Sequence, residues 1–300
     1  MSLPGRPKGE YRSAQHEGTP VSPPGRPPGT TASRFPLGLD RLGPAAGGSG
    51  VAATAARPLL RPQAPLQHAV LDAARRLTPS GLGLDSADVR RRMVQRLQAA
   101  GLHDEAVLAA LKAVPRHGFV DAALVTQAYE DTSLPIGHGQ TISKPSVVAR
   151  MLELLAAGAN AQATGTLGRV LEIGSGCGYQ AALLAQLSRR VVSIERIAPL
   201  HQMARRNLAA LRELRVSLLH GDGRLGHAPG APYDGIVAAA GGDDLPAAWL
   251  EQLAPGGRLV APVRGDGGRQ ALVVVDRTES GWRRSVHETV HFVPLRSGLD

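Results

Sequence analysis

The sequence predicts an α/β protein with a doubly wound, mostly parallel sheet of seven strands, preceded by N-terminal helices and a disordered basic tail. Three observations lead to this. From Arg169 onward, short β-rich runs alternate with helical runs, which is typical of a parallel sheet covered by helices on both faces. A glycine-rich turn follows the first of these strands, where such sheets bind ligands. Apolar residues in residues 1–80 recur with neither the helical nor the strand period.

The tail differs from the rest of the chain in composition. Residues 1–65 hold 12 of the 23 prolines, and residues 1–80 hold ten Lys and Arg against four acids. Such a segment cannot bury enough apolar surface to offset the entropy lost on ordering. We therefore expect residues 1–82 to be a disordered Pro/Gly/Arg-rich tail, with a short helix near Leu66–Leu77, and residues 83–300 to form one domain.

Three helices are expected before the sheet. They span residues 85–101, 104–114 and 146–158, where apolar residues recur at helical spacing and Gly or Pro marks the end. Between the second and third, the stretch "YEDTSLPIGHGQTISKP" (Tyr129–Pro145) reads as a polar loop with two glycines.

The predicted sheet elements follow in order. Strands are expected at residues 169–173, 190–195, 215–223, 233–240, 258–263, 271–277 and 289–295, with helices at 179–187, 198–214 and 245–254. We expect the last two strands to be an antiparallel pair, separated by the polar turn region "TESGWRR".

The strongest local signal is "VLEIGSGCGYQ", Val170–Gln180. Its glycines let the chain turn sharply and approach a ligand closely. Their spacing does not match the dinucleotide pattern, and no Lys follows as in a phosphate-binding P-loop. Glu172, just before the turn, disfavours a phosphate but suits a ligand with ammonium and sulfonium centres.

Acids also end the next two strands. Glu195 is placed to accept ribose hydroxyls, and Asp222 to accept from an exocyclic amine such as that of adenine. With the glycine turn, they predict a pocket for S-adenosylmethionine. Each acid has an alternative: Asp222 as a turn residue, Glu195 as a surface charge beside Arg196. Cys177 has no paired base nearby in sequence and is interpreted as a small loop residue.

Four stretches together resemble the protein-L-isoaspartate O-methyltransferase family: "YEDTSLPIGHGQTISKP", "VLEIGSGCGYQAALLAQL", "YDGIVAAA" and "LEQLAPGGRLVAPV". The resemblance extends from about Leu84 to Leu295. It implies a Rossmann-like methyltransferase sheet and a cytoplasmic repair enzyme that converts S-adenosylmethionine to S-adenosylhomocysteine. It also implies methylation of the free carboxylate of isoaspartyl residues in damaged proteins, after which the ester collapses to a succinimide.

The resemblance also implies site residues. Ser143, in the "TIS" element, matches the residue named as the active site. The implied cofactor positions are Thr141, Ile142, Glu172, Gly174, Ser175, Gly176, Glu195, Arg196, Asp222 and Gly223. Two residues depart from the family pattern: Lys144 stands where a neutral residue is expected, and Ala239 where Thr is frequent.

The reaction needs no general base, because a carboxylate with a pKa of about 4 is already ionised at neutral pH. Ser143 would therefore position the substrate carboxylate. Ser-Lys-Pro is also a good helix start, so Ser143 is expected to cap the helix that follows as well. His138 is expected to structure its loop, and Glu130 and Asp131 are expected to brace it or to border the substrate cleft.

Composition leaves two other functions open. The net charge of +9 and the sequence pI of about 10.6 suit anionic partners. The chain could thus methylate RNA or a small molecule, or could be a non-catalytic protein that binds nucleic acid through its tail. Aromatic residues make up only 3% of the chain, which disfavours a base-stacking surface.

Other features of the composition concern the setting of the protein. One cysteine permits no internal disulfide, and no apolar run is long enough to span a bilayer. We expect a cytoplasmic monomer without metal, membrane or nucleic-acid partners.

Overall fold

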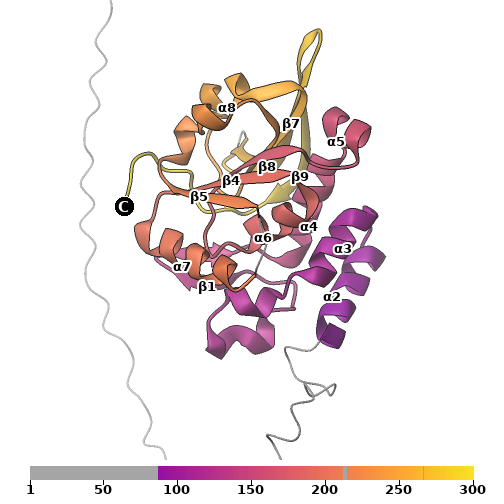
Figure 1. The fold of residues 1–300 in the computed structure, drawn as a ribbon, viewed down its shortest axis with the longest axis vertical. Coiled ribbons are helices and arrows are strands. Elements are labelled where there is room, and N and C mark those ends of the chain that lie inside the picture. Colours follow the sequence, from indigo (N-terminus) through magenta and orange to yellow (C-terminus); the bar gives the residue numbers. More distant parts are fainter. Residues whose placement is uncertain (1–86, 212–214, 266) are drawn as a thin grey trace, which may run out of the picture. The chain divides into compact units, whose positions relative to one another are not determined.

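The computed structural model describes residues 87–211, 215–265 and 267–300 (Figure 1). The expected tail, residues 1–82, and its short helix near residues 66–77 lie outside the described residues.

A seven-stranded sheet runs through the described part of the chain, in the order β5-β4-β3-β6-β7-β8-β9. The strands are β3 (Arg169–Ile173), β4 (Arg190–Glu195), β5 (Val216–His220), β6 (Tyr233–Ala238), β7 (Leu253–Arg264), β8 (Gln270–Thr278) and β9 (Gly281–Val290). β3 to β7 are parallel, and β8 and β9 are antiparallel. The predicted fold class is confirmed. β3 lies between β4 and β6, so the strand order reverses there and opens a crevice for ligand.

Helices cover both faces. They are α2 (Ala87–Ala99), α3 (Glu105–Ala113), α4 (Pro145–Ala156), α5 (Ala159–Thr164), α6 (Tyr179–Leu187), α7 (Ala198–Ala209) and α8 (Ala247–Glu251). Short 3₁₀ turns are η1 (Arg116–Phe119), η2 (Ala122–Gln127), η3 (Gly223–Leu225) and η4 (Ala228–Gly230).

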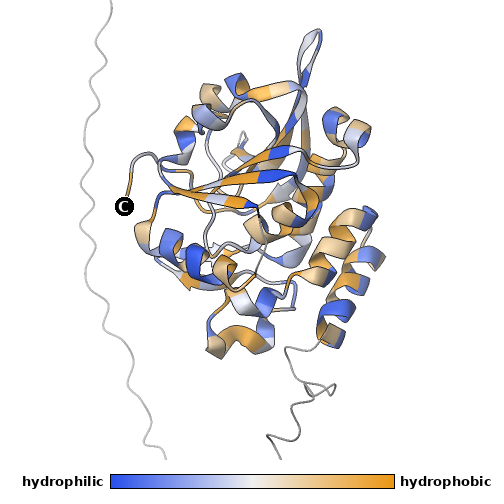
Figure 2. Ribbon diagram, in the orientation of Figure 1, coloured by the Kyte–Doolittle hydropathy of each residue, from blue (hydrophilic) through white to orange (hydrophobic). Residues whose placement is uncertain are grey.

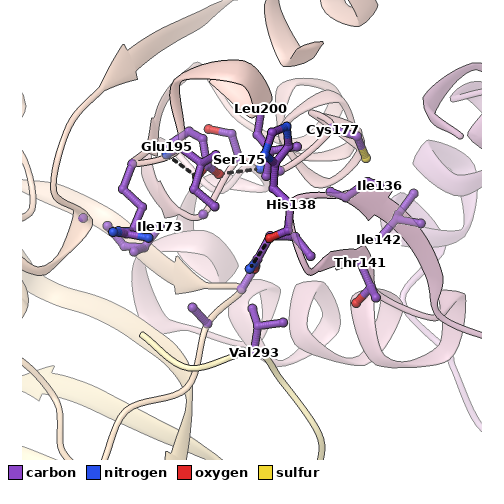
Figure 3. Close-up of a pocket in the computed structure, with 18 of the residues that line it drawn as sticks. Ile136, His138, Thr141, Ile142, Ile173, Ser175, Cys177, Glu195, Leu200 and Val293 are labelled. Atoms are coloured by element: carbon purple, nitrogen blue, oxygen red, sulfur yellow. Dashed lines mark hydrogen bonds between the residues drawn. The ribbon is translucent and has the colours of Figure 1, made fainter. Parts of the chain in front are cut away.

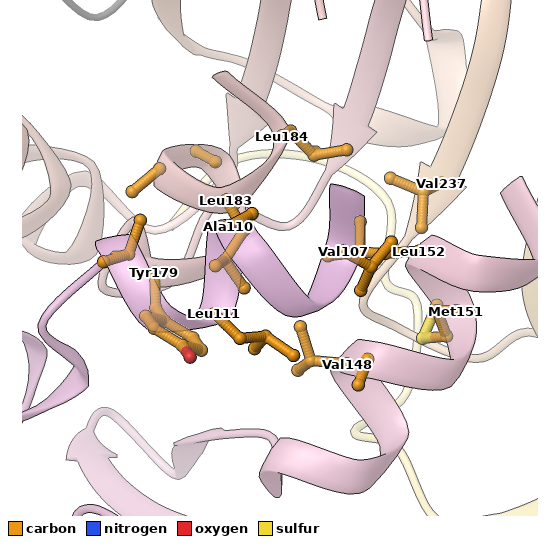
Figure 4. Packing of buried hydrophobic residues seen from close by; sticks show 14 of the residues in the cluster. Val107, Ala110, Leu111, Val148, Met151, Leu152, Tyr179, Leu183, Leu184 and Val237 are labelled. Atoms are coloured by element: carbon orange, nitrogen blue, oxygen red, sulfur yellow. The ribbon is translucent and has the colours of Figure 1, made fainter. Parts of the chain in front are cut away.

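The buried residues form one cluster on each face of the sheet. Successive residues of a strand point to opposite faces, so Val170 packs in the first cluster and Leu171 in the second. The first cluster joins α3, α4 and α6, which contribute Leu111, Met151 and Leu183, among others (Figure 4). Hydrophobic residues mark the central strands in Figure 2, as expected for strands buried on both faces.

Several predicted boundaries are wrong, among them that of the strand expected at residues 215–223, which ends at His220. β9 begins at Gly281, inside the stretch expected as a turn, and ends at Val290, before most of the strand expected at residues 289–295. β9 is an exposed edge strand without apolar alternation, so its sequence carries little strand signal. The helix expected at residues 245–254 is confined to α8, because Leu253 and the glycines after it already belong to β7. The helix expected at residues 198–214 ends at Ala209.

The stretch 129–145 is more ordered than the expected loop. It contains a hairpin of β1 (Leu134–Gly137) and β2 (Gln140–Ile142). Its turn, Gly137 to Gly139, has three successive positive φ angles of 88°, 53° and 67°. His138, at the centre of the turn, is the one non-glycine residue of the described chain with a positive φ angle. The glycines on either side adopt this backbone conformation easily and so accommodate the turn.

Within residues 87–211, 215–265 and 267–300, no helix has the length and apolarity needed to cross a membrane.

Candidate functional site

A cavity of about 310 Å³ lies at the carboxyl ends of β3 and β4, beneath the β1–β2 hairpin (Figure 3). Nine of the eleven predicted site residues line it: Thr141, Ile142, Ser143, Gly174, Ser175, Gly176, Glu195, Arg196 and Gly223. The other two, Glu172 and Asp222, do not line it.

The glycine turn forms one wall. Gly174, Gly176 and Gly178 have φ angles of 89°, 55° and 91°, which side chains rarely adopt. The turn is held against β4, because the backbone N–H of Gly174 donates 2.8 Å to the carbonyl of Ile194. The result is a fixed concave stretch of backbone facing the cavity.

Glu195 connects the turn to the next strand. Its side chain is 5% exposed, so the alternative of a surface charge is wrong. One oxygen accepts from the N–H of Gly176 at 2.9 Å, and the other accepts from the N–H of Ile197 at 3.0 Å. A carboxylate offers about four acceptor positions, so two remain for hydroxyl groups of a ligand.

Glu172 lies behind this wall and is fully buried. Ser193 donates to its carboxyl group, and Ser193 also hydrogen-bonds with Ser175. Burial raises the pKa of Glu172 to about 8, although the hydrogen bond from Ser193 opposes the shift. The group is therefore mainly protonated at neutral pH, and the negative charge expected beside the ligand is largely absent.

Asp222 follows β5, and its carboxylate is hydrogen-bonded on both oxygens. One of its carboxylate oxygens accepts from the N–H of Arg224 at 2.9 Å, as the turn alternative predicts, and the other accepts from the N–H of Gly298 at 2.7 Å. Arg196 contacts the same segment, donating 3.0 Å to the carbonyl of Gly298 and 2.7 Å to the carboxylate of Asp300. Both residues thus hold the end of residues 293–300, here called the C-terminal segment. Backbone hydrogen bonds of Gly241 with Val293 and Leu295 hold its start.

The C-terminal segment is one part of the site that the sequence did not predict; Tyr179, Ile197 and Leu200 are others. Residues Val293 to Arg296 and Asp300 of the segment line the cavity. They are mostly apolar and were assigned in part to a strand, so nothing in their chemistry indicated a site. Ala239, one of the departures, also lines the cavity and contributes only a methyl group there.

Ser143 is half-buried, and its hydroxyl has no hydrogen-bond partner among the described residues. The expected role of Ser143 as a helix cap is wrong. Lys144 occupies the capping position before α4, and its side chain makes no capping hydrogen bond. Instead Asp131 accepts from the N–H and the hydroxyl of Ser146, each at 2.8 Å. The expected bracing role of Asp131 is confirmed, and the Ser143 hydroxyl is left free.

A second cavity, of about 760 Å³, opens between α4, β9 and the end of α2. Its polar wall consists of Ser133, Ser143, Lys144, Ser146, Arg150, Glu153, Glu288, Thr289 and His291. Ser143 lines both cavities, so it stands at the boundary between them.

The structure supports neither a cysteine nucleophile nor, among the described residues, a metal site. Burial raises the pKa of the Cys177 thiol to about 11, so the thiol is not ionised at neutral pH. Among the residues that the structure describes, no three His, Cys, Asp or Glu side chains are grouped to hold a metal ion.

Comparison with known proteins agrees with this geometry. A family model described as protein-L-isoaspartate(D-aspartate) O-methyltransferase matches residues 88–300. The chain is 62% identical to the protein-L-isoaspartate O-methyltransferase of Methylibium petroleiphilum over 271 residues, which is 90% of this chain and 97% of that protein. It is 58% identical to that of Leptothrix cholodnii over 240 residues, or 79% of this chain and 84% of that protein.

Two solved structures share the fold. One protein-L-isoaspartate O-methyltransferase superposes with a TM-score of 0.62 at 27% identity, covering 70% of this chain and 67% of its own. A Plasmodium falciparum structure, described as such an enzyme in complex with S-adenosyl-L-homocysteine, has a TM-score of 0.58 at 23% identity. The match covers 69% of this chain and 98% of that one. By the family match and by its identity to these relatives, the chain belongs to the protein-L-isoaspartate(D-aspartate) O-methyltransferase family.

Proposed function

We propose that this chain methylates the free carboxylate of isoaspartyl residues in damaged proteins, with Ser143 positioning that carboxylate between the two cavities. Enzymes of the family use S-adenosylmethionine as the methyl donor. The observation that carries the proposal is the place of Ser143: its hydroxyl is unpaired among the described residues and lies where one cavity meets the other.

The smaller cavity fits the donor by its chemistry. The backbone of Gly174 to Gly176 leaves room for close approach, and Glu195 retains acceptor positions for ribose hydroxyls. Ile197 and Leu200 supply an apolar surface suited to a flat base. When bound, S-adenosylmethionine supplies an electrophilic methyl group on a positively charged sulfur.

The larger cavity suits the acceptor. A peptide carboxylate is ionised at neutral pH, so the chain has to position and desolvate it rather than remove a proton. The Ser143 hydroxyl can donate one hydrogen bond to it. The neighbouring residues of the peptide would lie along the polar wall formed by Lys144, Arg150 and Glu288. The ester formed would then collapse to a succinimide, which can reopen as aspartate.

The test uses the full chain, labelled S-adenosylmethionine and two peptides that differ only in isoaspartate or aspartate. We expect methylation of the isoaspartyl peptide alone. Ser143→Ala should lower turnover about 10- to 100-fold, the value of a hydrogen bond to a charged group, while the affinity for S-adenosylmethionine changes less than about threefold. Ser280→Ala, in the β8–β9 turn, is the control. Methylation of both peptides, or equal losses of turnover and cofactor affinity, would contradict the proposal.

We further propose a monomer that works in the cytoplasm. The support is that residues of one chain line both cavities, and that the single thiol is buried, with no disulfide possible within the chain. Light scattering on a sizing column tests the first point, with a dimer mass as the contrary result. Fractionation of cells that express the full chain tests the second.

The division of the chain at about residue 82 also remains our proposal. A chain beginning at residue 83 should methylate the isoaspartyl peptide as well as the full chain does. Salt-sensitive retention on nucleic acid by the full chain alone would assign a separate binding role to the tail.

A further inference from the structure

Arg116 is a fully buried cation next to the proposed site. Its Nε donates 2.8 Å to the carbonyl of Ala128, and its Nη2 donates 2.8 Å to the carbonyl of Ser143. The guanidinium lies 4.9 Å from the ring centroid of Tyr179, the first residue of α6 and a residue of the smaller cavity. One side chain therefore links the loop that carries Ser143 to the helix that follows the glycine turn.

This environment is unusual for a buried arginine. No carboxylate of the described chain forms an ion pair with Arg116, and its Nη1 lacks a hydrogen-bond partner among the described residues. Burying a cation without an anion is costly, because water no longer solvates it. Burial lowers the pKa of Arg116 from its ordinary value, although the neighbouring Tyr179 opposes this.

Arg258 shows what a structural arginine looks like in the same fold. Its side chain is also largely shielded, but it pairs with Asp276 at 2.6 Å and donates 2.8 Å to the carbonyl of Leu154. An arginine needed only for packing can thus be compensated in this scaffold. At Arg116 the hydrogen bonds go to two carbonyl oxygens, and the guanidinium lies over an aromatic ring.

We propose that Arg116 is a positioning residue for methyl transfer, which fixes the backbone of Ser143 relative to the wall of the smaller cavity. With its carbonyl held, the Ser143 main chain cannot rotate freely, so the Cα–Cβ bond that carries the free hydroxyl keeps one direction. Because Arg116 also stacks on Tyr179, this direction is fixed relative to the wall of the smaller cavity. The inference rests on the proposed role of Ser143.

The rigid planar fork of arginine is essential to this role, because it reaches two carbonyls and a ring at once. Lysine keeps the charge but cannot make these contacts together. We expect Arg116→Lys to lower kcat for the isoaspartyl peptide about tenfold or more, and Arg116→Met to lower it further. The affinity for S-adenosylmethionine should stay within about threefold in both variants, at a temperature where circular dichroism shows them folded.

Two further measurements separate positioning from plain stability. Arg258→Met is the matched control: it should lower Tm while leaving kcat and KM of the folded enzyme unchanged. In Arg116→Ala, millimolar guanidinium should restore part of kcat, since it can occupy the vacated space. The double variant Ser143→Ala, Arg116→Met should be no slower than the slower single variant, because both changes act on the same hydroxyl.

A folded Arg116→Met enzyme with the kcat of the wild type would overturn the inference, and so would multiplicative losses in the double variant. If Ser143→Ala impairs turnover while both Arg116 variants do not, only the inference fails. If Ser143→Ala leaves turnover unchanged, the proposed role of Ser143 fails, and the inference fails with it.

Discussion

Asp222, at the end of β5, accepts a hydrogen bond of 2.7 Å from the backbone N–H of Gly298, which lies in the C-terminal segment. The sequence predicts a contact between Asp222 and the cofactor; in the structure its carboxylate accepts from the N–H groups of Arg224 and Gly298. Arg196 holds the same segment through Gly298 and Asp300. Two residues at adjacent strand ends thus retain one wall of the cavity.

Replacing Asp222 should therefore weaken cofactor binding indirectly. Asp222→Ala removes the acceptors of both Gly298 and Arg224, so we expect the Kd of S-adenosylmethionine to rise about fivefold, the value of roughly 1 kcal/mol for a lost hydrogen bond. Asp222→Asn retains one acceptor and should lose less. Calorimetric titration checks both, with exposed Asp243→Ala as the control. An unchanged Kd for Asp222→Ala would contradict the role of the C-terminal segment.

Glu172 should make the folded state less stable as the pH rises. Its folded pKa of about 8 lies above the ordinary value of 4.5, so the folded chain keeps a proton that the unfolded chain loses between these values. The stability that this carboxyl group contributes is fully present below about pH 4.5 and is lost as the pH rises through 8. Glu172→Gln cannot ionise and should not show this loss.

Urea unfolding at pH 5, 6.5 and 8 measures the effect. The wild-type chain should lose unfolding free energy relative to Glu172→Gln across this series. Exposed Glu279→Gln should follow the wild type. Parallel curves for the wild type and Glu172→Gln would show that Glu172 is ionised in the folded chain.

Asp131 should stabilise the start of α4. Its carboxylate accepts from the N–H and hydroxyl of Ser146 in the first turn, which is the work of a helix cap. Asp131→Ala should lower the free energy of unfolding by about 1 kcal/mol. Lys144→Ala removes only an exposed ion pair of 3.9 Å with the same carboxylate and should change stability by less than about 0.5 kcal/mol. Equal losses in the two variants would assign the effect to the ion pair.

Cys177 should resist alkylation in the folded chain. Burial raises its pKa to about 11 and leaves almost no thiolate at neutral pH, and the thiolate is the reactive form. Iodoacetamide at pH 7.5 should leave the native chain unmodified over the time in which the urea-unfolded chain reacts fully, as followed by mass spectrometry. Rapid labelling of the native chain would indicate that the cavity opens often enough to expose the thiol.

The elements that sequence reasoning placed correctly share a physical cause. β3 and β4 are short runs, rich in apolar residues and buried after their first residue; glycines follow β3, and the acid Glu195 ends β4. Such runs have few alternative structures. β9 could not be placed, because it gains its strand structure by pairing with β8 and has no apolar face of its own.

The site was predictable only where chemistry and position coincide. Glu195 could be predicted because it is an acid at the end of a strand, and it does line the cavity. Glu172 has the same signature, but its burial and protonation depend on Ser193 and on the surrounding core, which the local sequence does not reveal. Arg116 gave no signal at all, because its role comes from Ser143 and Tyr179, which are distant in sequence.

The attachment of the C-terminal segment also sets an order for folding. Asp222 and Gly298 lie 76 positions apart, and Arg196 and Asp300 lie 104 positions apart. Contacts between such distant residues carry a larger loop-closure entropy cost than local ones, so they form after the local helices and hairpins. A refolding chain should regain its circular dichroism before it regains cofactor binding, and an enzyme that repairs aged proteins would itself become active only at the last step of its own folding.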